Sequence, residues 1–144
     1  MPMDVHTPEG EARWLAEQHR HLMEYLERES VRHADVPDEP ELHIPPYLAL
    51  YHLPAAPDSN TGWWVITGDV PTDHVSDHRA DDGRQALRAF ARKWRTAAGV
   101  MAGRQDADNA DGATPEQSQA AARHLFERAK MLHQLADKDE IWGE

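Results

Sequence analysis

Two short apolar stretches decide the fold: YLALYHL at residues 47–53 and GWWVIT at residues 62–67. Both are rich in aromatic and branched side chains and are bounded by Pro, Gly, Asp and Asn, so both are predicted to be β-strands. The polar loop between them is short enough for an antiparallel hairpin. Because Trp63 and Trp64 point to opposite faces of a strand, both faces of the hairpin are apolar, and the sheet is expected to be covered on both sides.

An amphipathic helix is predicted before the hairpin, over residues 8–31. Thr7 supplies the N-cap and Pro8 the first helical position, and the large apolar side chains that follow gather on one face. The stretch from Asp35 to Pro46 holds four prolines and several acids. Because it cannot continue a helix, it is interpreted as a connector.

Two more amphipathic helices are predicted after the hairpin. One begins at Asp82, whose side chain is expected to cap it, and an apolar stripe follows at intervals of three and four residues. The other begins at a capping box in residues 114–117 and ends near Lys138. Residues 103–113 between them carry no hydrophobic side chain larger than Ala, so they are expected to form a mobile loop. Trp142 is expected to return onto the protein.

These elements predict an α+β fold in which three main helices pack on a short antiparallel β-hairpin, in the order α-β-β-α-α. The length of 144 residues suits a single domain with one core, preceded by a flexible start over residues 1–7. A two-stranded hairpin has two free edges. Pairing of two chains through these edges into a four-stranded sheet is therefore a homodimer hypothesis.

Composition excludes several classes of function. The chain has no Cys, which removes disulfides, thiolate nucleophiles and Cys-based metal sites. Its net charge of -11 argues against binding to nucleic acid or to a membrane surface. The sequence shows no long apolar run and no signal peptide at its start, so a cytoplasmic protein is expected. It also lacks nucleotide-binding glycine motifs and a serine elbow, which favours a non-enzyme without a cofactor.

The segment that follows the second strand is the first candidate site. It carries three carboxylates and two imidazoles, namely Asp69, Asp73, His74, Asp77 and His78. These are metal-ligating and acid/base groups, but two His side chains four residues apart converge on a metal only in a helix. Pro71 and Ser76 disfavour a helix. The pattern therefore favours a turn in which the Asp side chains accept hydrogen bonds from local backbone amides.

A row of arginines on the second predicted helix is the second candidate site. Its members are Arg84, Arg88, Arg92 and Arg95. They lie within about 80° of one another around a helix of 3.6 residues per turn. Arginine clusters bind carboxylates and phosphates, so this row, together with Trp63 and Trp64, is a candidate surface for an acidic partner or an anionic metabolite. In the alternative, acidic residues of the first helix and of residues 35–41 neutralise the row within the fold.

Several of these stretches resemble a bacterial family known as domain of unknown function number 4826. The most specific part is GWWVITGDVPTD at residues 62–73. The other similar parts are residues 46–51, residues 86–90, Trp94, residues 128–132 and the terminal Ile141-Trp142. The resemblance implies a single-domain bacterial protein of the cytosol and implies no activity. His74 stands where the family reads Tyr, which argues against this imidazole as a shared metal ligand.

The sequence therefore predicts a protein of unknown function that acts as a non-enzymatic protein-binding or regulatory domain. It would present its acidic surface and the arginine row to a protein partner. An alternative hypothesis is a metal-dependent hydrolytic or metal-binding protein that uses the Asp and His side chains of residues 69–78. A third hypothesis is the binding of an anionic small metabolite along the arginine row.

Overall fold

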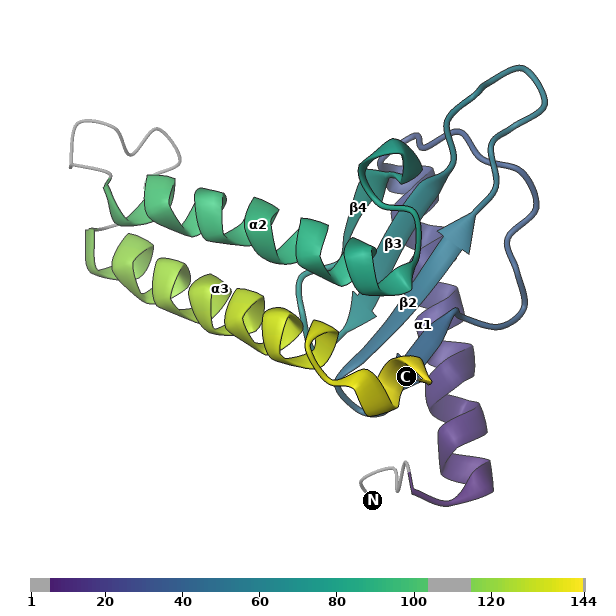
Figure 1. The fold of residues 1–144 in the computed structure, drawn as a ribbon, viewed down its shortest axis with the longest axis horizontal. Helices are drawn as coiled ribbons and strands as arrows, with labels where there is room; N and C mark the ends of the chain where they lie inside the picture. Colours follow the sequence, from purple (N-terminus) through teal and green to yellow (C-terminus); the bar gives the residue numbers. More distant parts are fainter. Residues whose placement is uncertain (1–5, 104–114, 144) are drawn as a thin grey trace. The chain divides into compact units, whose positions relative to one another are not determined.

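A computed structural model of the chain describes residues 6–103 and 115–143 (Figure 1). These residues form an α+β protein with three α-helices and a four-stranded antiparallel sheet. The chain divides into two compact units, residues 1–86 and 87–144. The single domain stays a prediction. The flexible start, the mobile loop and the capping role of Thr114 were predicted for stretches that lie wholly or mostly outside the described residues.

The sheet of the first unit has the strand order β1-β2-β3-β4, and every neighbouring pair is antiparallel. The strands are β1 (Leu42–Ile44), β2 (Leu48–Leu53), β3 (Trp63–Gly68) and β4 (Asp73–Ser76). The central pair is the predicted hairpin, with Leu50 opposite Ile66 and Tyr51 opposite Val65. A short 3-10 helix, η1 (Asp77–Arg79), follows β4.

The two outer strands correct the predicted two-stranded hairpin. β1 lies in the stretch interpreted as a connector, and β4 lies in the segment interpreted as a turn. Three and four residues are too few for an alternating pattern to be recognised, and β4 has a single apolar residue, Val75. Because β1 and β4 pair with the outer edges of β2 and β3, the edges on which the homodimer hypothesis rested are occupied within the chain.

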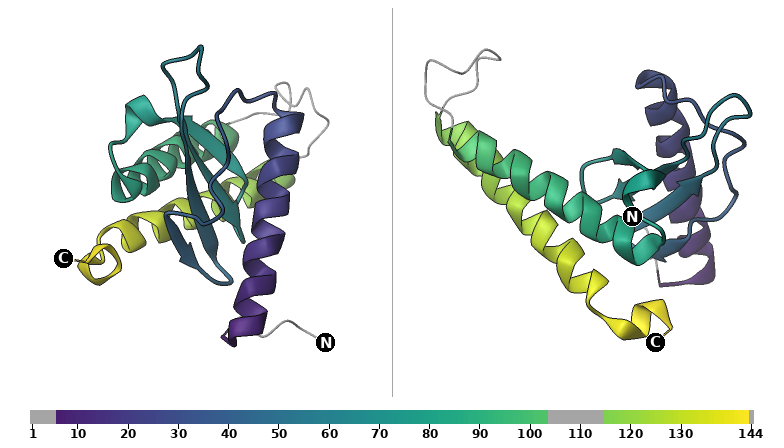
Figure 2. Two further views of the ribbon diagram at one scale, coloured as in Figure 1. Left: turned by 90° about the vertical axis from the view of Figure 1, so that its right-hand side faces the viewer. Right: turned by 45° about the horizontal axis from the view of Figure 1, so that its top comes forward.

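Helix α1 (Pro8–Arg28) covers one face of the sheet (Figures 1 and 2). It begins as predicted, because the Thr7 side chain accepts a hydrogen bond from the amide of Gly10 and Pro8 is the first helical residue. Its apolar face and the α1 side of the sheet share one buried cluster: Trp14, Leu22, Tyr25, Leu26, Ala49, Tyr51, Leu53 and Val65. Full burial of each large side chain stabilises the unit by about 1.5–3 kcal/mol.

Trp63 and Trp64 lie on opposite faces of the sheet. Trp63 packs against the cluster under α1, and its indole nitrogen donates to the carbonyl of Arg32 at 2.8 Å. Trp64 is on the other face, only 4% exposed, and its indole donates to the carbonyl of Ala80 at 3.0 Å. Leu50 and Ile66 on that face are also fully buried. Both faces of the hairpin are therefore buried, as the sequence predicts.

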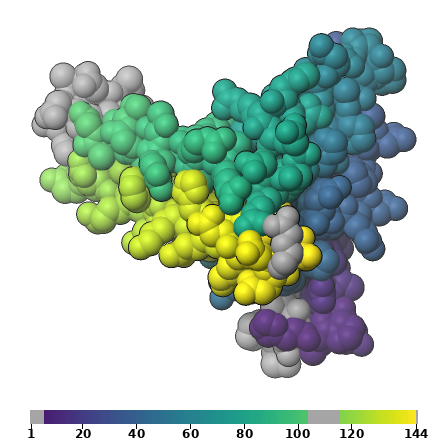
Figure 3. All heavy atoms as spheres, in the orientation of Figure 1, coloured from purple at the N-terminus to yellow at the C-terminus, as the bar shows by residue number. Residues whose placement is uncertain are grey.

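Helices α2 (Gly83–Ala102) and α3 (Pro115–Ala136) run antiparallel, side by side, over most of the second unit (Figures 1 and 3). Buried alanines at four positions allow close approach of two helices: Ala98, Ala122, Ala129 and Ala136. The side-chain amide nitrogen Nε2 of Gln119 donates a hydrogen bond to the backbone carbonyl of Ala102 at 2.7 Å and joins the two helix ends.

The cap of α2 and the C-terminal segment follow the sequence prediction. The Asp82 side chain accepts a hydrogen bond from the amide of Gln85 at 2.8 Å and caps α2. Beyond α3, Trp142 of the short helix η3 (Asp139–Trp142) donates to the carbonyl of Leu135 and packs back as expected. None of the helices in residues 6–103 and 115–143 is both long and apolar enough to cross a lipid bilayer.

Substitution of Gly68 by Ala is expected to destabilise the protein by about 2 kcal/mol or more, because two penalties combine. Gly68 has a φ of 124°, and a Cβ there would lie 2.5 Å from the carbonyl oxygen of Tyr47. Gly99→Ala in α2 is the matched control, since a Cβ there meets nothing within 4 Å. The control should be neutral or stabilising by about 0.5–1 kcal/mol. Urea unfolding measures both, and equal effects would contradict the strand-end geometry.

Candidate functional site

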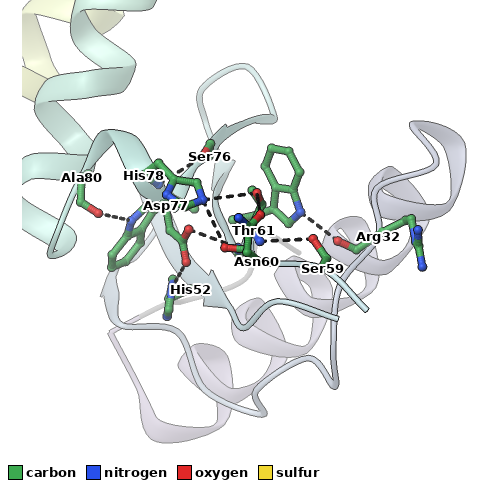
Figure 4. A network of polar contacts seen from close by, with 12 residues as sticks. Arg32, His52, Ser59, Asn60, Thr61, Ser76, Asp77, His78 and Ala80 are labelled. Carbon is green, nitrogen blue, oxygen red and sulfur yellow. Dashed lines mark hydrogen bonds and ion pairs between the residues drawn. The ribbon is translucent and has the colours of Figure 1, made fainter. Parts of the chain in front are cut away.

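Asp77 is the centre of a polar network at the end of the sheet (Figure 4). One carboxylate oxygen accepts a hydrogen bond from the amide of Gly62 at 3.1 Å, and the other lies 3.1 Å from Nε2 of His52. These partners come from β2 and from the residue before β3, while Asp77 opens η1. The network therefore joins residues 25 and 15 positions apart in the sequence.

Gly62 is what allows the Asp77 carboxylate to lie against the start of β3. Gly62 is buried, and a Cβ there would lie 2.3 Å from Oδ2 of Asp77 and 2.6 Å from the carbonyl oxygen of Leu53. Any side chain would therefore displace the carboxylate. A glycine is therefore needed at the first position of the GWW motif. The absence of a side chain there leaves room for the Asp77 carboxylate, which accepts the hydrogen bond of the Gly62 amide.

The same carboxylate lines a hollow with a volume of about 390 Å³. The residues that line it are Glu41, His52, Trp64, Asp77, Ala80, Asp81, Asp82 and Gly83. Four of these eight side chains are carboxylic acids and none is Lys or Arg. The imidazole of His52 and the indole of Trp64 form a wall, with ring centroids 4.6 Å apart and planes inclined by 37°. We call this feature the acidic hollow.

The other residues of the predicted metal site are dispersed. Nδ1 of His74 lies 2.5 Å from the hydroxyl of Tyr25, under α1, with the ring edge against Trp63. Nε2 of His78 instead lies 3.1 Å from the carbonyl oxygen of Asn60 in the hairpin loop (Figure 4). β4 and η1 occupy this segment, so the spacing of four residues lacks the helical geometry that would bring the two imidazoles together.

The two remaining acidic residues of that site take part in hydrogen bonds with the backbone. Asp73 accepts a hydrogen bond from the amide of His74 at 2.8 Å, the kind of contact that the turn interpretation expects. Asp69 is exposed, and its amide donates to the carbonyl of Tyr47. Among the residues that the structure describes, no three His, Asp or Glu side chains come together in a way that would hold a metal ion. The metal site stays a prediction without a preformed geometry.

Tyr25 fixes the imidazole of His74. Burial, together with the smaller effect of the nearby Asp73 carboxylate, raises the pKa of the Tyr25 hydroxyl to about 12. The phenol is therefore protonated at neutral pH, and it can donate its hydrogen bond to Nδ1 of His74 in the tautomer whose Nδ1 carries no proton. This arrangement ties β4 to α1 and is structural in character.

Two of the three arginines of α2 that belong to the second unit contact α3 or the residue that follows it. Arg88 pairs with Asp137 at 3.3 Å, and the guanidinium of Arg95 lies over the ring of Phe126, 5.7 Å from its centre. The carboxylate that pairs with Arg88 thus follows α3, where the sequence interpretation had looked to the first helix and residues 35–41. Arg84, Trp63 and Trp64, the other members of the predicted anion surface, belong to the first unit.

His133 on α3 is a member of this basic region that sequence reasoning missed. Desolvation lowers the pKa of its imidazole, and the positive charges of Arg95, Arg92 and Arg88 lower this pKa further, against the opposite effect of Asp137. Nε2 is buried and has no hydrogen-bond partner among the described residues. In the sequence His133 counts as one of several scattered histidines; the one available signal is its place next to Leu132 on the apolar side of α3.

Comparison with known proteins gives one match. The family model described as Domain of unknown function (DUF4826) matches residues 9–142. No curated protein and no solved structure matches the chain. The match agrees with the resemblance seen in the sequence, and it assigns no activity to the residues of the acidic hollow or of the arginine row.

His74→Ala and His78→Ala are expected to change the free energy of unfolding additively, within about 0.3–0.5 kcal/mol, because His74 contacts Tyr25 whereas His78 contacts Asn60. The two single variants and the double variant should be unfolded in urea, once with a chelator and once with zinc. A coupling energy above about 1 kcal/mol that arises only with zinc would instead support the metal site.

The lowered pKa of His133 predicts that the protein loses stability as the pH falls. The unfolded chain takes up this proton near the ordinary pKa of 6.5, whereas the folded protein resists it. The contribution of His133 to stability is therefore fully present above pH 6.5, and it is lost as the pH falls from there to the lowered pKa. His133→Gln should reduce the difference between melting temperatures at about pH 7.5 and pH 5. His124→Gln, an exposed position on the same helix, is the control; an equal effect there would contradict the prediction.

Proposed function

The chain belongs to the family described as Domain of unknown function (DUF4826), and we propose that it acts there as a non-enzymatic protein-binding domain of the cytoplasm. Its acidic hollow would receive a basic side chain from a segment of the partner. The main support for this proposal is the lining of the hollow, which contains four carboxylates and two aromatic rings but no Lys or Arg.

The charge of the first unit supports a basic partner. Residues 1–86 contain seventeen Asp and Glu against six Arg and no Lys. Such an excess creates a negative potential that attracts a cationic segment and speeds its association. The rim residues Glu41 and Asp81 are exposed, and they make no ion pair with any residue in the described part of the chain. Their carboxylates are free to accept hydrogen bonds from a guanidinium or an ammonium group.

The interior of the hollow is arranged before any partner binds. Asp77 is held on one side by the amide of Gly62 and on the other by His52, and its side chain remains 26% exposed. Trp64 is fixed by its bond to Ala80. A carboxylate held beside an indole and an imidazole suits an arginine, because a planar guanidinium pairs with carboxylates and stacks on aromatic faces. Groups held in place by the fold lose little freedom on binding.

The lining also bears on the choice between binding and catalysis. His52 and Asp77 form a pair able to carry a proton, with Nε2 and Oδ2 3.1 Å apart. The lining contains no Ser, Thr, Tyr or Lys that the pair could activate for a covalent step. The side chains of this lining thus favour recognition of a cation over covalent catalysis.

An arginine-rich peptide of alternating Arg and Gly is the probe that tests this function. The double variant Glu41→Gln/Asp81→Asn should weaken its binding about five- to tenfold, because two carboxylates are lost at the rim. The double variant Glu17→Gln/Glu24→Gln removes the same net charge from the exposed side of α1 and should weaken binding less than about twofold. Fluorescence anisotropy at moderate salt measures both. Equal weakening, or no binding by the unaltered protein, would refute the proposal.

A further inference from the structure

A second surface, of opposite charge, lies along the seam between α2 and α3. Residues 87–102 of α2 include three Arg and one Lys but no Asp or Glu. Arg88, Arg92 and Arg95 are four and three residues apart and therefore share one side of the helix. All three act on His133 of α3 through their positive charge. We call these four residues the arginine seam.

The described structure neutralises little of this positive charge. Asp137 pairs with Arg88, but its side chain is 72% exposed, and pairs of this kind contribute little to stability. The ring of Phe126 orients the guanidinium of Arg95 without cancelling its charge. Arg92 is exposed and has no carboxylate partner among the described residues. Three guanidinium groups thus share one weakly held carboxylate.

The length of the arginine seam favours an extended anion over a small one. Arg88 and Arg95 are seven residues apart, which is about 10 Å along a helix. A single phosphate group would contact one end of the row. A row of carboxylates repeated at helical spacing would reach all three guanidinium groups, each of which can bind a carboxylate in a bidentate manner. We propose that the arginine seam binds an acidic segment of a partner protein.

The arginine seam would bind a different class of ligand from that of the acidic hollow. The acidic hollow lies in residues 41–83 and would bind a cation, whereas the seam lies in residues 88–133 and would bind an anion. The two surfaces bind ligands of opposite charge, so each can be removed while the other is kept. A chain that carries both would join a basic segment to an acidic one.

The experiment uses the full chain and a fluorescent helical peptide with Glu at intervals of four and three residues. Arg92→Glu should raise its dissociation constant at least about tenfold, because an attraction becomes a repulsion at an exposed site that leaves the fold intact. Arg13→Glu on α1 changes the net charge equally and should raise the constant less than about twofold. Glu41→Gln/Asp81→Asn should leave peptide binding at or slightly above its original strength, which separates this test from that of the hollow.

His133 reports binding at the seam directly. Carboxylates placed beside the arginines stabilise the imidazolium, so the His133 ring signal in an NMR titration should move to a higher pKa when the peptide is bound. Three results would overturn the proposal. These are equal weakening in Arg92→Glu and Arg13→Glu, peptide binding that leaves His133 unmoved, and pyrophosphate binding as tightly as the peptide with the same shift, which would assign the seam to a small anion.

Discussion

The pairing of β2 with β3 is the contact on which the first unit depends. The side chains at the centre of these strands, residues 49–51 and 64–66, are apolar on both faces, so the pair is stable only when both faces are covered. α1 covers one face, and the short strands β1 and β4 complete the hydrogen bonding at the outer edges. The same pairing places the start of β3 beside the end of β2, which brings Gly62, His52 and Asp77 into one network.

Features that depend on neighbouring residues could be predicted from the sequence, and features that depend on distant pairing could not. The caps at Thr7 and Asp82 are contacts over three residues, and both were predicted correctly. β1 and β4 are strands only because β2 and β3 offer them edges, and nothing in three or four residues signals this. The residues of the predicted metal site are dispersed in the structure for the same reason. Asp77 was grouped with its neighbours in sequence, while its actual partners are His52 and Gly62.

The two glycines of the family motif shape the backbone around β3, and the charged residues are distributed unevenly along the chain. Gly62 makes room for Asp77, and Gly68 adopts a positive φ beside Tyr47, so both glycines of the motif serve the geometry around β3. Acids outnumber bases in residues 1–86, and four of these acids line a hollow whose lining contains no Lys or Arg. The basic residues gather on α2. The proposed binding role rests on these two surfaces of opposite charge.

The proposed binding of a cation in the hollow around Asp77 can be tested at the residues of its polar network. The most direct measurement is an amide and side-chain NMR titration of the labelled protein with an arginine-rich peptide. If the peptide binds in the acidic hollow, the largest chemical-shift changes should fall on the amide of Gly62, the indole of Trp64 and the imidazole of His52. Shifts concentrated instead on His74 and Tyr25, or spread evenly over the acidic side chains of α1, would contradict it.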